Sequence, residues 1–243
     1  MSKELKVKED TSVAIDDNFG VADGLSASDL TIPSIKIGQA ITAEVKAGEI
    51  KYGEIFESVG TEVLAKPGEK LEAIFLKVEK CLFVTSGEKG NKFERIDPFV
   101  EGYDYTEEVN GVKYQKSLSY RYYVVLAKDI KAGLPFPCVL NLMKSNMKVA
   151  KKLNTIFSKM RLAQKKSHEF VFNIFGSEVG SDNGTYYVFN VNQERTTTKE
   201  ESEAAKFIFD MIGKTKLKID DAPVDRIEAD PSTKKNIEDD LQF

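Results

Sequence analysis

The sequence has little of the residue types that carry most catalytic chemistry. Its 243 residues include two cysteines, one histidine and no tryptophan. Cys81, Cys138 and His168 are too few and too scattered for a zinc site or a disulfide framework. With no second histidine and no cysteine beside it, His168 lacks the partners of a nucleophilic catalyst. We therefore expect no enzyme, no metal and no cofactor, and the scarcity of cysteine favours a reducing, cytoplasmic setting.

Other patterns are missing as well. No run of about 18 apolar residues is present, so we expect no transmembrane helix and no membrane partner. The first residues, Met1–Lys6, lack the apolar segment of a signal peptide. The segment Gly87–Lys92 lacks the spacing and the Ser/Thr of a phosphate-binding loop. The carboxylates show no spacing that converges on a two-metal site, which places a nuclease last among the functions considered.

Charge is present in quantity but unevenly distributed. The net charge of −4 argues by itself against a simple nucleic-acid binder. Residues 110–177, however, carry 13 basic and 2 acidic side chains, a net of +11. The segments before and after them are all acidic, with nets of −5 for residues 1–70, −4 for 71–109 and −6 for 178–243. A strongly basic middle inside an acidic total is the charge pattern of a nucleic-acid binder.

Short runs rich in Tyr, Phe and Val predict a mainly β chain. Asn110-Gly111 and Asn183-Gly184 stand between such runs, where a type I′ hairpin turn is expected. The strands are expected at residues 51–58, 71–85, 118–127, 137–142, 169–175 and 186–191. Residues 216–219 alternate and could add a last strand.

Two segments have helical periodicity instead. Over residues 145–163, apolar side chains recur at spacings of 4, 3, 4 and 3, namely Val149, Leu153, Ile156, Met160 and Ala163. A second helix is expected over residues 199–212, because Thr198 and Glu201 form a capping box and Gly213 suits the end of a helix.

A series of short aromatic strands with one helix inserted among them predicts an OB-like Greek-key barrel, mainly β with added α. The predicted organisation has three parts. Residues 1–28 form a flexible N-terminal arm, residues 29–213 the OB-like domain with its inserted basic helix and C-terminal helix, and residues 214–243 a flexible acidic tail.

The inserted helix is the first candidate site. Eight basic residues with no acidic residue among them lie between positions 144 and 166: Lys144, Lys148, Lys151, Lys152, Lys159, Arg161, Lys165 and Lys166. We expect them to share the exposed face of the helix, away from its apolar stripe. Exposed helices usually intersperse glutamates, because oppositely charged i,i+4 pairs stabilise and like charges destabilise. This helix is therefore expected to face a polyanion such as a phosphate backbone, with a merely solvated surface as the alternative.

Aromatic residues near the basic segment are the second candidate. Strand alternation places Tyr120 and Tyr122 on one face, and Arg121 and Tyr123 on the other. Because Val125 follows Tyr123 on its face, we expect that face to be buried and Tyr120 and Tyr122 to point outward. Exposed tyrosines could then stack on bases while Arg121 contacts phosphate; a role in the core is the alternative.

The C-terminal residues 237–243 carry three acids, no base and a terminal aromatic ring, namely Glu238, Asp239, Asp240 and Phe243. Such a peptide can occupy a basic groove in place of phosphates, or dock in a partner's pocket. An acidic C-terminus that closes in Phe, behind an OB-type body, resembles the single-stranded DNA-binding proteins of bacteria and of their phages. The bacterial tip has a proline before the Phe, where this chain has Leu241-Gln242, and this difference favours a phage-encoded or dedicated partner.

That resemblance implies a sequence-nonspecific single-stranded DNA-binding protein of phage DNA replication or recombination, acting in the host cytoplasm. The tail would compete with DNA and recruit polymerase, helicase–primase or nuclease. Two alternatives remain open: a recombination mediator or annealing protein, which would form rings or filaments, and a non-catalytic phage virion or assembly protein. A homo-oligomer is compatible with each.

Overall fold

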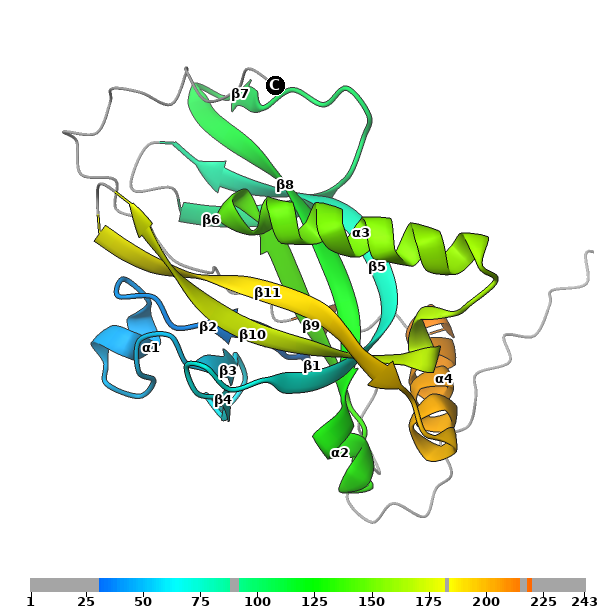
Figure 1. Ribbon diagram of the computed structural model, residues 1–243. Helices are drawn as coiled ribbons and strands as arrows, with labels where there is room; N and C mark the ends of the chain where they lie inside the picture. The colour runs from blue at the N-terminus through cyan, green and yellow to red at the C-terminus, as the bar shows by residue number, and fades with distance from the viewer. Residues whose placement is uncertain (1–30, 88–91, 182–183, 215–217, 220–243) are drawn as a thin grey trace, which may run out of the picture.

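The computed structural model describes residues 31–87, 92–181, 184–214 and 218–219 (Figure 1). The chain is mainly β with added helices, which confirms the predicted class. Its strands are β1 (Thr31–Ile32), β2 (Ser34–Ile37), β3 (Ile55–Glu57), β4 (Val63–Ala65), β5 (Leu71–Ser86), β6 (Lys92–Pro98), β7 (Thr106–Val109), β8 (Val112–Leu126), β9 (Pro137–Met143), β10 (Phe170–Ser181), β11 (Gly184–Thr196) and β12 (Lys218–Ile219). Its helices are α1 (Ala43–Lys46), α2 (Ala127–Lys131), α3 (Met147–Leu162) and α4 (Lys199–Lys214), with 3₁₀ turns η1 (Lys144–Asn146) and η2 (Ser167–Glu169).

Ten strands form one open sheet. Its order is β11-β10-β5-β8-β9-β2-β3-β4, with β6 also paired to β5 and β7 to β8. The central strand β5 pairs with β10 near its start and with β8 along most of its length. It bends at a bulge, since Phe75 pairs with Val124 and Lys77 with Tyr123, which leaves Leu76 without a partner across the ladder. This bend lets a single long strand belong to both halves of the sheet.

The sheet bears helices on both faces (Figure 1). On one face, Ala150 and Leu153 of α3 pack on a core that includes Phe75, Tyr122 and Phe172. On the other face, Ala205, Ile208 and Ile212 of α4 pack against a second cluster that includes Tyr123 and Val125. Successive residues of β8 therefore serve opposite cores, as the two-residue alternation of a strand requires.

The predicted hairpin turn at Asn110-Gly111 is confirmed. The two residues have φ of 53° and 80° and join β7 to β8, whose Val109 and Val112 are paired. A type I′ turn needs positive φ at both central positions. Asn183 of the other predicted turn lies outside the described residues.

Side chains, rather than ladder bonds, bring the β11 edge of the sheet to the segment after β2. The Gln39 side chain donates to the Tyr187 carbonyl at 2.8 Å and accepts from the Tyr187 N–H at 3.0 Å. The Tyr187 ring packs edge-on against Tyr52, with centroids 4.9 Å apart. Gly53, with φ of +83°, leaves the space for this ring, because a Cβ there would meet it at 2.5 Å. These contacts hold the β11 edge of the sheet against the segment between β2 and β3, although no ladder joins β11 to β2 among the described strands.

The predicted capping box of the C-terminal helix is confirmed. Thr198 N–H donates to the Glu201 carboxylate at 2.9 Å, and Glu201 N–H to the Thr198 hydroxyl at 3.2 Å. Arg195 of β11 bridges Glu201 to Glu72 of β5 through both carboxylates. Hydrogen bonds from Arg195 hold the pKa of Glu201 and of Glu72 below the usual value. One arginine therefore ties α4 to the centre of the sheet.

The predicted domain boundaries fall only partly within the described residues. Helix α4 continues to Lys214, and β12 pairs in parallel with β1 within the range assigned to the tail. The predicted N-terminal arm, residues 1–28, and residues 220–243 lie outside the described residues. No helix in the described ranges is long and apolar enough to cross a membrane.

Candidate nucleic-acid interface

Helix α3 lies across one face of the sheet, as the apolar spacing predicts. Val149, Leu153 and Met160 are buried, and Ile156 packs at the edge of the same core. The Tyr122 hydroxyl on β8 holds the helix against the sheet by donating to Asn154 Oδ1 at 2.8 Å. The predicted helix over residues 145–163 is confirmed to within two residues at its start and one at its end.

All eight predicted basic residues are exposed to solvent. They are Lys144, Lys148, Lys151, Lys152, Lys159, Arg161, Lys165 and Lys166. Five belong to α3, whereas Lys144 lies in η1 before it and Lys165 and Lys166 follow it. Across residues 31–87, 92–181 and 184–213, no carboxylate is within ion-pair distance of any of the eight. The helix region thus carries unneutralised positive charge.

The basic residues do not form a single row. Lys148, Lys152 and Lys159 share one side of α3, because their spacings of 4 and 7 bring them within about 40° of one another. Arg161 and Lys165 instead line a pocket between the end of α3 and the bend of β5. The eight residues are all exposed, as expected, but they do not share one side: Lys148, Lys152 and Lys159 lie on one side of α3, and Arg161 extends into the pocket.

The predicted outward face of β8 is wrong. Tyr122 is fully buried under α3, and Tyr120 is half-buried with its ring stacked on Tyr122 at 6.4 Å between centroids. Burial raises the pKa of Tyr122 well above its usual value. Tyr122 therefore cannot stack on a base in this structure, because α3 covers the face that the sequence left open. Counting apolar neighbours on β8 could not reveal this, since both faces of the strand are covered.

Arg121 of β8 is likewise not an exposed residue. It points to the opposite face of β8, is 8% exposed, and its Nε donates to Asn141 Oδ1 at 3.5 Å. Its neighbour on that face, Tyr123, donates to Glu79 at 3.0 Å, and burial first and Glu79 second raise the pKa of Tyr123 to about 12. The prediction that Arg121 contacts phosphate is therefore corrected: its side chain is buried and has a structural role.

The predicted partner-binding residues of the C-terminus lie outside the described residues. They are Glu238, Asp239, Asp240 and Phe243. Their roles in competing with DNA and in recruiting partners stay predictions.

An aromatic group that the sequence reasoning missed lies between β6 and β7. Phe99, Tyr103 and Tyr105 form a chain of ring contacts with centroids 5.9 and 5.1 Å apart, and Tyr105 is 72% exposed. Lys80 of β5 places its ammonium 4.7 Å from the centre of the Phe99 ring. The run of aromatics at 99–105 is visible in the sequence, but its acidic surroundings gave no reason to join it to the basic segment.

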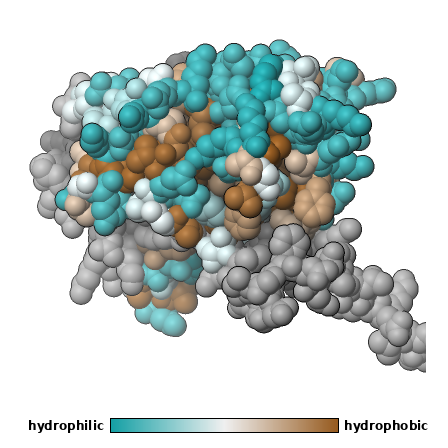
Figure 2. Space-filling model, turned by 90° about the horizontal axis from the view of Figure 1, so that it is seen from below, coloured by the Kyte–Doolittle hydropathy of each residue, from teal (hydrophilic) through white to brown (hydrophobic). Residues whose placement is uncertain are grey.

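A second exposed feature of the surface is apolar. Seen from below, brown hydrophobic patches reach the surface between hydrophilic residues (Figure 2). Among the exposed apolar side chains are Leu134, after α2, at 77% and Phe207 of α4 at 67%. Leu162, the last residue of α3, is exposed at 86%, so exposed apolar side chains occur beside the basic residues as well.

The fold and surface define a mainly β protein with a cationic helix laid across its sheet. The chain belongs to the Pam3 phage gp34-like protein family, whose model matches residues 7–218, and is thereby placed among phage proteins. No curated protein and no solved structure matches it. In the described part of the chain, no three His, Cys, Asp or Glu side chains are grouped to hold a metal ion.

Proposed function

We propose that this phage protein binds single-stranded DNA without sequence preference and acts in phage DNA replication or recombination in the host cytoplasm. The observation that carries the proposal is the cationic surface of α3. Eight exposed basic residues without a described carboxylate partner form a surface on which a phosphate backbone would replace many small counterions.

The charge order within α3 supports an external polyanion. A helix N-terminus carries a partial positive charge, so acids are favoured in the first turn and cations are not. Helix α4 follows this rule with Glu200 and Glu201. Helix α3 has no acid in its first turn and places Lys148 there instead. One chain thus contains a helix whose first turn complements the dipole and another whose first turn does not.

The strand order supports the OB-like prediction. Within β11-β10-β5-β8-β9, the first strand along the chain, β5, pairs with the second, β8, and with the fourth, β10. Helix α3 connects the third strand, β9, to the fourth. In this proposal the order corresponds to the Greek-key arrangement of an OB-fold, in which surfaces beside the second and third strands and nearby loops bind oligonucleotides. In this proposal the additional strands β2–β4 extend the open side of the barrel.

The tail would regulate that surface. Its three carboxylates and terminal ring, by resemblance to single-stranded DNA-binding proteins, would occupy the basic surface until DNA displaces them and then engage replication proteins such as polymerase, helicase–primase or nuclease. A variant that ends after Asp221 keeps every described element and should bind an oligonucleotide more tightly. Unchanged or weaker binding would count against competition by the tail.

The proposal is tested by titrating the full chain into fluorescent oligo-dT and into a duplex of the same length at two salt concentrations. We expect tight binding to the single strand that weakens steeply with salt, and much weaker binding to the duplex. Equal affinity for the two forms, or none, overturns the proposal. Rapid pairing of complementary strands would instead indicate an annealing protein, and metal-dependent degradation would indicate a nuclease.

A further inference from the structure

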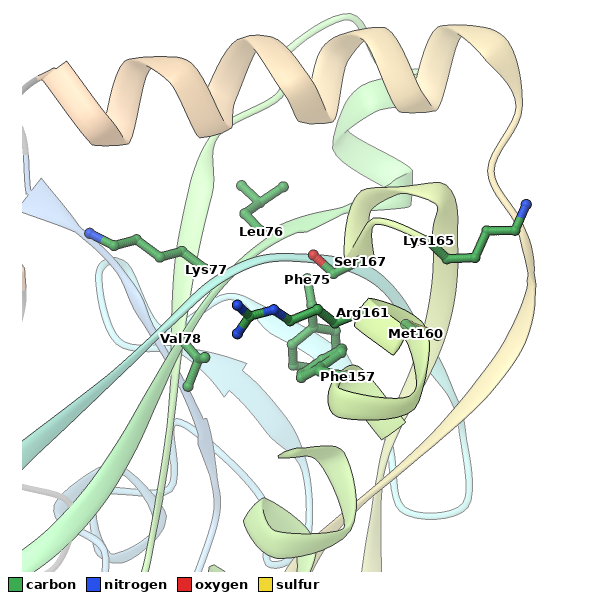
Figure 3. Close-up of a pocket in the computed structure, with 9 residues that line it drawn as sticks. All are labelled: Phe75, Leu76, Lys77, Val78, Phe157, Met160, Arg161, Lys165 and Ser167. Carbon is green, nitrogen blue, oxygen red and sulfur yellow. The ribbon is translucent and has the colours of Figure 1, made fainter. Parts of the chain in front are cut away.

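A pocket of about 190 Å³ opens where the C-terminal end of α3 meets the bend of β5 (Figure 3). Its walls are apolar, formed by Phe75, Leu76 and Val78 of β5 and by Phe157 of α3. Arg161 extends across these walls from the next turn of the helix, and its guanidinium points to the Val78 side of the pocket (Figure 3). The pocket therefore combines apolar walls with one planar cation.

The pocket lies beside the bulge in β5. The register of β5 against β8 shifts at Leu76, which lines the pocket, and α3 ends at Leu162, about two turns after Asn154, which binds Tyr122. Val78 stands opposite Tyr122 in the ladder, yet Val78 is 43% exposed while Tyr122 is fully buried. An apolar strand residue is thus left uncovered at the centre of a large sheet, beside a cation.

The charges around the pocket are of one sign. None of its lining residues is acidic. The ammonium of Lys77 pairs with Glu79 at 2.6 Å, so it is already neutralised. Arg161 and Lys165 have no carboxylate partner in the part of the chain that the structure describes, and Lys165 extends away from the pocket toward solvent (Figure 3). A ligand with an apolar plane and a negative charge is the complement of this arrangement.

The volume limits the size of the ligand. Pockets for drug-sized molecules and cofactors are about 300–1,000 Å³. This pocket is smaller, so it suits one ring system rather than a whole cofactor. Nucleobases present a π-face to side chains whatever the sequence, and an arginine plane can stack on that face.

We propose that the pocket receives one base of the single strand, stacked on the Arg161 guanidinium and packed against Val78, with the adjoining phosphates at Lys165 and Lys166. The inference rests on the proposed single-stranded DNA binding. It gives that function a source of strand selectivity, because a base held in a duplex cannot leave its stack to enter the pocket without breaking its pair.

The test compares two substitutions that both retain positive charge. Arg161→Lys removes the plane that stacks, and Lys46→Arg changes an exposed residue of α1 that lies neither in the pocket nor among the eight basic residues. Val78→Ser removes apolar contact from the opposite wall. We expect Arg161→Lys and Val78→Ser each to weaken oligo-dT binding about fivefold or more, as loss of a base stack does, with Lys46→Arg unchanged. Duplex affinity and the salt dependence should be the same in all four proteins.

Ultraviolet crosslinking adds a measurement that would not change if Arg161 had a purely structural role. Crosslinked oligo-dT should be recovered on peptides that contain Val78 or Phe157, and less of it in Arg161→Lys. Full oligonucleotide affinity in Arg161→Lys overturns the pocket, as does an equal loss in Lys46→Arg. If the unsubstituted chain binds no oligonucleotide, the proposed function itself fails. If Arg161→Lys changes only the effect of removing the residues after Asp221, the occupant is the tail rather than a base, which also overturns the inference.

Discussion

Replacing Lys148, Lys152 and Lys159 by glutamine should separate the affinity of the protein for DNA from its stability. The three residues are exposed on one side of α3 and have no described carboxylate partner. Glutamine is close to lysine in helix propensity, so the helix itself should persist. The change removes three positive charges without altering the buried stripe.

The stability terms nearly cancel. Removing Lys148 from the first turn relieves an unfavourable interaction with the helix dipole of about 0.3–1 kcal/mol. Removing Lys148 and Lys152 together relieves a like-charge i,i+4 pair of about 0.2–0.5 kcal/mol. Losing Lys159 from the last turn forfeits a favourable dipole interaction of about 0.3–1 kcal/mol. The free energy of unfolding should therefore change by less than about 1 kcal/mol.

The effect on binding should be much larger. Each phosphate contact on a single strand contributes about 0.7 to the slope of log affinity against log salt concentration, so three contacts contribute about 2. The variant should show a slope smaller by about 2 and, at 0.1 M salt, an affinity about 100-fold lower, with the two proteins converging near 1 M.

The assay is oligo-dT titration at four or more salt concentrations, with urea unfolding for stability. A matched control carries Lys46, Lys66 and Lys70 changed to glutamine, because these residues are also exposed but belong to α1 and the β4–β5 turn. The reasoning is refuted if both triple variants lower the slope equally, or if the α3 variant keeps the original slope.

Three further predictions concern stability. Tyr122→Phe should lower the free energy of unfolding by about 1 kcal/mol through the lost hydrogen bond to Asn154, yet leave oligonucleotide affinity unchanged; weakened DNA binding in a stably folded variant would restore Tyr122 as a contact residue. Gly53→Ala should cost about 2–4 kcal/mol, because it adds left-handed strain to a collision with the Tyr187 ring, whereas Gly48→Ala, also at positive φ but with open space around it, should cost only about 1 kcal/mol; equal effects in thermal unfolding would reject the collision. Arg195 lowers the pKa of Glu72 and Glu201 in the folded state, so its contribution is present above the unfolded-state value of 4.5 and is lost as the pH falls through the folded values; urea unfolding of the unsubstituted protein should weaken more between pH 7 and 3.5 than that of Arg195→Met, and parallel pH curves would contradict this.

Local signals predicted the elements well. Apolar spacing located α3, the Thr198–Glu201 pair located the start of α4, and Asn110-Gly111 located a hairpin, because each of these depends on residues close in sequence. Strands β6 and β7 were missed, since both are polar and the aromatic residues between them fall in a loop.

The faces of β8 could not be predicted in the same way. Alternation correctly separated Tyr122 from Tyr123, but it could not say which face is buried, and both are. The answer depends on α3 and α4, which follow β8 by about 20 and 70 residues and cover its opposite sides.

The sequence by itself determined the charge of this protein: an acid-free basic segment on an amphipathic helix, because charge and helical period are properties of neighbouring residues. Only the tertiary structure decided where that charge lies. The helical period already turns Arg161 about 140° from Lys148, but only the tertiary structure decided that this side of α3 meets a pocket beside the bulge of β5 at Leu76. The bulge shifts the register between residues that are 46 to 49 positions apart in the chain, and no local pattern records it.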